Sequence, residues 1–206
     1  SGVVLGNLGY THCSIEDMGI LRSIPNITIL SPADCTETAK AFESMLRYKG
    51  SVYLRLTGGT NNPIVYNDDY SFEIGKSIKL REGDDCTIFA TGTMVNVSLK
   101  AADILAEKNI KNEIINMHTI KPIDKLQIEI SAKKNKKIFS VEEHSVYGGL
   151  GSAIAEVLVE QEIRPKLIKI GLKDDYDTEG DYKFILEQNG LTPELVVKKI
   201  LAEHKT

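Results

Sequence analysis

Ile138-Phe-Ser-Val-Glu-Glu-His-Ser-Val-Tyr-Gly-Gly-Leu-Gly-Ser152 is the segment of this chain that best indicates an α/β protein. Residues 138–141 are typical of a short buried strand, and a charged, glycine-rich loop over 142–152 leads into a helix predicted over 151–161. Strands and helices alternate in the same way on both sides of this stretch. Such alternation predicts βαβ units and a mostly parallel sheet.

The elements predicted around this stretch complete one α/β unit. An edge hairpin is expected over 72–80, strands over 86–90, 113–117 and 167–170, and helices over 94–108, from Pro122 through 132, and from Pro193 through 202. Proline is favoured at the first position of a helix, which supports the last of these. We therefore predict a three-layer α/β/α sandwich over residues 72–206.

The first 56 residues predict only part of a second α/β unit. Ser14 and Asp17 have the spacing of a capping box before a helix, and Asp34 is the expected N-cap of another helix over 38–48. Strands are predicted over 27–30 and 51–56. So few strands leave apolar surface uncovered, unless a second copy or a complementary chain packs against it.

Turn-forming residues separate the two parts. The segment from Thr57 to Asp69 is polar, with Gly-Gly-Thr-Asn-Asn-Pro followed by Asn-Asp-Asp, and it cannot fill a core. We predict a partial first domain over residues 1–60, a linker over 61–71 and a second domain over 72–206.

Composition excludes several classes of protein. The 206 residues carry a net charge of −4, and the 25 basic residues are scattered, which disfavours a nucleic-acid partner. No apolar run is long enough to span a membrane. Three widely spaced cysteines have no zinc-site spacing and fit a reducing compartment. These features predict a cytoplasmic protein without a metal site of its own.

Two basic side chains are candidates for chemistry. His12 lies between a glycine turn and a predicted helix, where it can contact an anion, move a proton near neutral pH, or merely cap the helix. Arg55 lies on an otherwise apolar strand, either as the buried partner of a carboxylate or as a fork that binds a phosphate. Cys13 beside His12 is a weaker candidate, since neighbours in sequence need not face one another.

The glycines of 148–152 allow two interpretations. The turn follows a strand and opens a helix, so its backbone amides are suited to an anion such as phosphate. Its spacing differs from the dinucleotide-binding pattern, however, and glycines at such junctions often only allow a helix to pack closely on a strand. We favour the packing interpretation.

Several motifs together resemble the transketolase family. Gly9-Tyr-Thr-His-Cys-Ser-Ile-Glu-Asp17 and Leu21-Arg-Ser-Ile-Pro-Asn-Ile-Thr-Ile-Leu-Ser-Pro-Ala-Asp34 resemble the second half of its pyrimidine-binding domain, and Tyr53-Leu-Arg-Leu56 resembles the strand that closes it. Val141 to Ser152, Gly92-Thr-Met94 and Lys121-Pro-Ile-Asp124 resemble its C-terminal domain. The resemblance runs nearly from end to end of the chain.

This resemblance implies the C-terminal section of an enzyme that uses thiamine diphosphate and Mg²⁺ to move a two-carbon ketol unit between sugar phosphates. His12 is then the catalytic candidate, in the active-site funnel, and Arg55 the substrate-binding candidate, on the sugar phosphate. The cofactor motifs of the family belong to segments that do not occur in these 206 residues. We therefore expect no cofactor on this chain alone, no turnover without an N-terminal section or subunit, and a homodimer.

The sequence departs from the family pattern at two positions, and two other functions are alternatives to this expectation. Leu8 stands where single-chain members usually carry an acidic residue, and Cys13 replaces a commoner glutamine. One rival is a non-catalytic module that uses the C-terminal fold for dimerisation or regulation. The other, less favoured, is a nucleotide-binding domain at the Gly148 turn.

Overall fold

A five-stranded sheet forms the centre of the molecule in the computed structural model, which describes residues 1–59, 62–176 and 179–204. Its order is β3–β5–β4–β7–β8, with bounds Ile78–Arg81 (β3), Cys86–Ala90 (β4), Asn112–Asn116 (β5), Lys137–Ser145 (β7) and Lys166–Leu172 (β8). All neighbours pair in parallel except β3, which runs antiparallel to β5 at one edge. The predicted mostly parallel sheet is confirmed.

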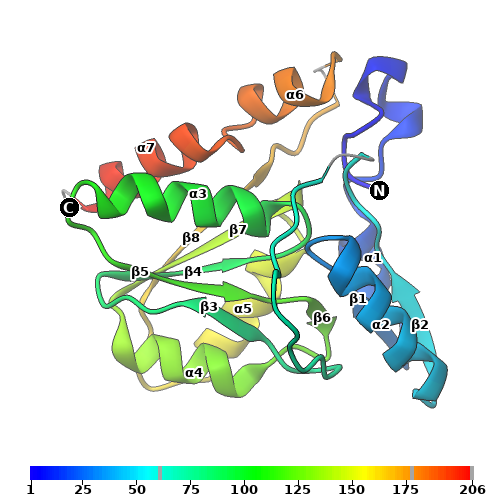
Figure 1. The fold of residues 1–206 in the computed structure, drawn as a ribbon, viewed down its shortest axis with the longest axis horizontal. Helices are drawn as coiled ribbons and strands as arrows, with labels where there is room; N and C mark the ends of the chain where they lie inside the picture. Colours follow the sequence, from blue (N-terminus) through cyan, green and yellow to red (C-terminus); the bar gives the residue numbers. More distant parts are fainter. Residues whose placement is uncertain (60–61, 177–178, 205–206) are drawn as a thin grey trace.

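Helices cover both faces of this sheet (Figure 1). The helices α3 (Met94–Ala106) and α7 (Pro193–His204) lie on one face, and α4 (Lys125–Lys134) and α5 (Leu150–Val159) lie on the other. Two apolar clusters fill the space between the layers, one under α3 and α7 and one under α4 and α5. The predicted three-layer sandwich is therefore confirmed.

The N-terminal region builds a smaller sheet at the side of the sandwich. β1 (Ile27–Leu30) pairs in parallel with β2 (Ser51–Leu54), and the helices α1 (Asp17–Arg22) and α2 (Cys35–Arg47) accompany them. Its third strand, β6 (Thr119–Lys121), comes from the second half of the chain and pairs antiparallel with β1. The two regions are thus joined by backbone hydrogen bonds as well as by the chain.

The structure confirms one of the two predicted helix caps. The side chain of Asp34 accepts a hydrogen bond from Glu37 N at the start of α2, as predicted. The predicted capping box at Ser14 is wrong. Helix α1 begins after Glu16 with no side-chain cap, because the carboxylate of Asp17 bonds elsewhere.

Other predictions needed correction. No hairpin forms over 72–80: only β3 forms there, and it pairs with the distant strand β5. Strand β7 continues through residues 142–145, predicted as loop, since polar partners satisfy their side chains inside the protein. Strand β6 and helix α6 (Tyr182–Gln188) were not predicted, because both are too short to show a period. Residues 60–61, at the predicted domain boundary, lie outside the described residues.

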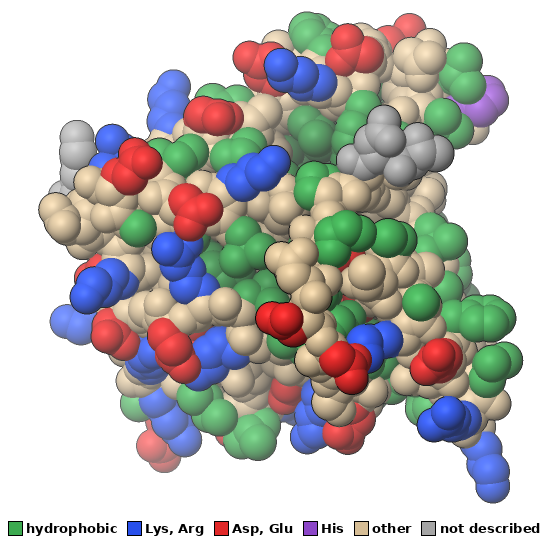
Figure 2. Space-filling view, viewed as in Figure 1, with side chains coloured by type: hydrophobic (Ala, Val, Ile, Leu, Met, Phe, Trp, Pro, Cys, Tyr) green, Lys and Arg blue, Asp and Glu red, His purple; other side chains and the backbone are tan. Residues whose placement is uncertain are grey.

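Apolar side chains remain at the surface of the N-terminal region. Ile20 and Ile24 around α1, Phe42 and Leu46 on α2, and Leu56 after β2 are all at least 45% exposed. Figure 2 shows hydrophobic side chains at the surface over α2 and β2. The uncovered apolar surface predicted for this region is confirmed. Among the described residues, none of the helices has both the length and the apolar character needed to cross a bilayer.

Candidate functional site at the carboxyl ends of the strands

His12 lies on a closed loop at the N-terminus. Gly2 and Ser14 exchange two backbone hydrogen bonds of 2.8 and 3.1 Å, which close the loop at its base. Between them lie two short 3₁₀ helices, η1 (Gly6–Leu8) and η2 (Tyr10–His12). The His12 side chain is exposed, with Nδ1 3.0 Å from the Thr11 hydroxyl. The ring is therefore accessible to a molecule outside the chain, as a proton donor or acceptor must be.

Glu143, at the carboxyl end of β7, holds the first part of this loop. Its Oε1 accepts a 2.8 Å hydrogen bond from Val3 N, and its Oε2 accepts bonds of 2.6 Å from both the Thr93 and Tyr182 hydroxyls. Glu143 is 1% exposed. Three donors thus compensate the buried carboxylate, as burial of a charge requires.

Arg55 lies inside the protein, 1% exposed. Its Nε donates to Asp17 Oδ2 at 2.8 Å, and its Nη2 donates to the carbonyl oxygens of Glu143 at 2.9 Å and of Ser14 at 3.4 Å. The sequence left two interpretations of Arg55 open, and these contacts match the first: Arg55 is the buried partner of a carboxylate. The contacts do not support binding of a sugar phosphate by Arg55, because the phosphate would have to displace Asp17.

Asp17 receives its hydrogen bonds from the end of strand β2 and the residue that follows it. Burial by itself raises the pKa of this carboxyl group, but the Arg55 guanidinium and a 2.9 Å hydrogen bond from the Tyr53 hydroxyl bring the pKa below its usual value. Burial and the Asp17 charge raise the pKa of Tyr53 to about 12. Asp17 is therefore ionised at neutral pH and Tyr53 keeps its proton.

His144 connects β7 to helix α1. Gly19 N donates to His144 Nε2 at 3.2 Å, and Nδ1 lies 2.7 Å from Ser145 O, so the neutral ring carries its proton on Nδ1. Burial lowers the pKa of His144. This histidine is consequently a neutral structural link at neutral pH.

The glycine-rich turn at 148–152 receives an anion from the chain itself. Leu150 N and Gly151 N, at the start of α5, donate to the two carboxylate oxygens of Glu142 at 2.6 and 2.8 Å. Burial raises the pKa of Glu142 to about 7 in spite of these two bonds. Gly148 packs against Gly19 of α1, where an added methyl group would lie 2.7 Å from the Gly19 Cα. These contacts favour the packing interpretation over a phosphate cradle.

The structure brings some predicted residues together and separates others. The loop of His12, the turn at Thr93 and the end of β7 meet at the carboxyl edge of the sheet, where ligands of open α/β sheets usually bind. His12 and Arg55 do not share an opening, since one is exposed and the other buried. Cys13 is half-buried, and burial raises the pKa of its thiol, which disfavours a thiolate.

Sequence reasoning missed Asp17, Glu143 and Tyr182 as members of this cluster. The sequence pattern places Asp17 in a helix cap and Glu143 in a loop. The signal that could have found Glu143 is its place directly after the apolar strand 138–141. Tyr182 has no such signal, because only the folded chain brings α6 to β7.

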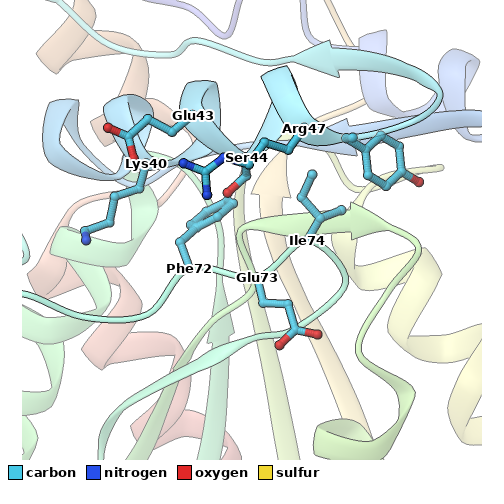
Figure 3. Close-up of a pocket in the computed structure, with 8 residues that line it drawn as sticks. Lys40, Glu43, Ser44, Arg47, Phe72, Glu73 and Ile74 are labelled. Carbon is cyan, nitrogen blue, oxygen red and sulfur yellow. The ribbon is translucent and has the colours of Figure 1, made fainter.

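A groove beside α2 is a different feature (Figure 3). It is a cavity of about 440 Å³ in which Arg47 and Phe72 lie near one another, and Lys40, Glu43 and Glu73 line it as well. Two basic and two acidic side chains balance its charge. None of the candidate site residues singled out by the sequence lines this groove.

The described residues do not fit the diphosphate and metal of a thiamine cofactor. No group of three or more His, Cys, Asp or Glu side chains in the described part of the chain is arranged to hold a metal ion. The amides of the glycine-rich turn already bind Glu142. Among the site residues predicted from the sequence, His12 is exposed on a loop that backbone hydrogen bonds close, whereas Arg55 is buried.

Fold and site together define an α/β sandwich domain preceded by a partial α/β unit that carries an exposed histidine at the strand ends. Two family models match the chain in that order: the transketolase pyrimidine-binding domain over residues 1–61, and the transketolase C-terminal domain over residues 75–196. The second match covers more than half of the chain. The chain therefore belongs to the transketolase family, as the resemblance predicts.

Curated relatives carry the same family name. A protein described as a putative transketolase C-terminal section from Methanocaldococcus jannaschii is 39% identical over the whole chain, which spans 64% of that relative. One of the subunits of an apulose-4-phosphate transketolase from Phocaeicola vulgatus is 37% identical over 97% of the chain, again 64% of the relative. The chain spans about three fifths of the length of these relatives.

Solved structures agree with the fold. One solved structure is titled as a split gene transketolase, inactive beta4 tetramer. It superimposes on this chain with a TM-score of 0.85 at 37% sequence identity, and the match covers 93% of this chain and 62% of the other chain. The structure of a transketolase variant from Pichia stipitis matches with a TM-score of 0.71 at 21% sequence identity. The match covers the whole of this chain and 29% of the Pichia stipitis chain. The second likeness supports the fold alone.

Proposed function

We propose that this chain is the C-terminal part of a split transketolase-type enzyme. The complete enzyme transfers a two-carbon ketol unit between sugar phosphates with thiamine diphosphate and Mg²⁺, and the remaining section supplies the groups that bind the cofactor. Support comes from the family matches over residues 1–61 and 75–196 and from relatives named as transketolase subunits. The cofactor supplies the carbanion chemistry. The observation that carries the proposal is an exposed His12 in the segment that matches the pyrimidine-binding domain.

His12 has a defined part in this proposal. Its exposed ring donates a proton to, or accepts one from, a sugar oxygen while the carbon–carbon bond breaks. We assign Arg55 to the loop rather than to the sugar phosphate, because its guanidinium already bonds Asp17 and the Ser14 carbonyl. Boundaries at residues 60 and 71 stay predictions.

The partner in this proposal is the N-terminal section of the same enzyme. The uncovered apolar side chains around α1, α2 and β2 support a partner that packs on the N-terminal region. A second copy of the chain is a further candidate for that surface, as the homodimer prediction requires. The similar structure titled as an inactive tetramer favours self-association without activity, and it keeps the non-catalytic module as the alternative function.

Reconstitution tests the proposal. The chain is assayed with thiamine diphosphate, Mg²⁺ and a panel of ketose and aldose phosphates, with and without the N-terminal section from the same genome. We expect turnover only with that section, and a loss of about 10²- to 10⁴-fold in kcat for His12→Ala. A correctly assembled wild-type complex that is inert on every sugar phosphate would instead favour the non-catalytic module.

A further inference from the structure

We propose that Glu143 and Tyr182 are positioning residues for His12, and that the C-terminal domain contributes to catalysis by fixing the loop of residues 2–14. This inference rests on the proposed function for the role of His12. It assigns a positioning role to two side chains that lie far from His12 in the sequence.

Both ends of the loop are attached to the last residues of β7. At the first end, Val3 N donates to the Glu143 side chain at 2.8 Å. At the other end, Ser145 N donates to Ile15 O at 2.8 Å, and Arg55 Nη2 bridges the carbonyl oxygens of Ser14 and Glu143. The loop therefore has its two ends fixed against one strand of the large sheet.

Glu143 is itself held from two other elements. The Thr93 hydroxyl comes from the turn between β4 and α3, and the Tyr182 hydroxyl comes from the start of α6. Gly2 leaves room for this carboxylate, because a methyl group at residue 2 would overlap Glu143 Oε1. The position of Val3 N thus follows from three parts of the C-terminal domain.

Helix α6 also touches the outer part of the loop. Gly180 N lies 3.4 Å from Gly6 O, its acceptor, and an added methyl group at Gly6 would overlap the Ile185 side chain. The rings of Tyr10 and Tyr176 meet edge to face with centroids 4.9 Å apart. The same segment that carries Tyr182 therefore supports the turn that leads to His12.

The consequence concerns the direction of the imidazole. The His12 side chain is exposed, so the packing of a core does not set its orientation, and the backbone of the loop has to do so. Misplacement of a reacting group by about 1 Å costs on the order of 10²-fold in rate. Loss of the Glu143 contact should therefore lower kcat even though Glu143 never meets the substrate.

Hydrogen–deuterium exchange measures how firmly the loop is held, and it needs no activity assay. Glu143→Ala is expected to speed exchange of residues 2–14 about tenfold or more, since the Val3 amide loses a bond to a charged acceptor. Tyr182→Phe removes one hydroxyl from Glu143 and should give a smaller change in the same direction. Glu113→Ala is the matched control, because Glu113 is another fully buried carboxylate of the same sheet, bonded to Thr87 and Ser131.

Kinetics of the reconstituted enzyme separate positioning from a structural role. Glu143→Ala should lower kcat about 10²-fold with little change in KM, and Glu143→Gln should restore most of it, because its amide oxygen still accepts from Val3 N. In a His12→Ala background, Glu143→Ala should cause almost no further loss. The matched control Glu113→Ala should leave kcat unchanged.

Each outcome decides the inference. Unchanged exchange of residues 2–14 in both Glu143→Ala and Tyr182→Phe would overturn it, and so would full additivity of Glu143→Ala with His12→Ala. If the wild-type complex is inert on all sugar phosphates, the proposed function fails together with the catalytic part of this inference. The exchange data then still decide whether Glu143 fixes the loop.

Discussion

The two regions of this molecule bury their polar and apolar groups in different ways. The C-terminal sandwich places aliphatic and aromatic side chains between its own layers, where Phe89, Phe139 and Ile114 are completely buried. The N-terminal region takes its third strand from the sandwich, and its buried Arg55 donates to the Glu143 carbonyl oxygen of the sandwich, while Phe42 and Leu46 stay exposed on α2. The N-terminal region therefore depends on the sandwich for backbone and side-chain hydrogen bonds, whereas the sandwich fills its core with its own side chains.

The buried ion pair should give the largest effect on stability. Arg55→Met leaves the Asp17 carboxylate buried without its partner, so the free energy of unfolding should fall by about 3–5 kcal/mol. Arg81→Met is the control: its partner Asp103 is largely exposed, and the loss should stay below about 1 kcal/mol. Urea unfolding of both variants measures the difference. Equal losses would show that the N-terminal region does not depend on this pair.

The glycine contact between the regions is the next test. Gly148→Ala combines a positive φ of 76° with a clash against Gly19, whereas Gly190→Ala has a similar φ of 74° and open space around it. Thermal unfolding should show Gly148→Ala less stable by about 1–3 kcal/mol more than Gly190→Ala. A difference near zero would mean that α1 can move away from the turn without cost.

A pH titration examines a buried carboxyl group between the regions. Burial raises the pKa of Glu37 to about 7, so the folded state holds a proton that the unfolded state releases near pH 4. Its contribution to stability is complete below that unfolded pKa and is lost as the pH rises through about 7, with a slope of up to about 1.4 kcal/mol per pH unit. Glu37→Gln should remove this slope.

The substitution Glu37→Gln suits the site because Asn116, its neighbour, has a buried Oδ1 without a hydrogen-bond partner among the described residues. Rotation of the Asn116 amide lets that oxygen accept from the new glutamine. Denaturant midpoints for both proteins, measured from pH 5 to pH 8, give the comparison. An unchanged slope in the variant would assign the pH dependence to other groups, such as Glu142.

The smallest effect on stability is expected at the exposed face of α2. The double variant Phe42→Ser, Leu46→Ser should change the free energy of unfolding by less than about 0.5 kcal/mol per site, since both side chains are more than half exposed. It should weaken self-association in sedimentation velocity, because this apolar surface lacks a cover in the chain itself. Val159→Ser, exposed on α5 of the sandwich, is the control and should leave association unchanged.

The sandwich and the family were predictable from local features of the sequence. Alternation of strands such as 86–90 with helices such as α3 depends on local periodicity, and the Asp34 cap needs only residues three positions away. Motifs from Gly9 through the Gly148 turn carried the resemblance that the family matches confirmed. These features depend on neighbours along the chain, and a single sequence displays them.

The environments of the buried polar side chains depend on contacts that form only in the folded chain. Arg55 meets Asp17 and Glu143, which are 38 and 88 positions away, and the anion at the start of α5 is Glu142 rather than a ligand. Strand β6 reaches β1 from the other half of the chain. Such partners are chosen by the geometry of packed layers, because a buried charge must find a partner wherever the folded chain brings one.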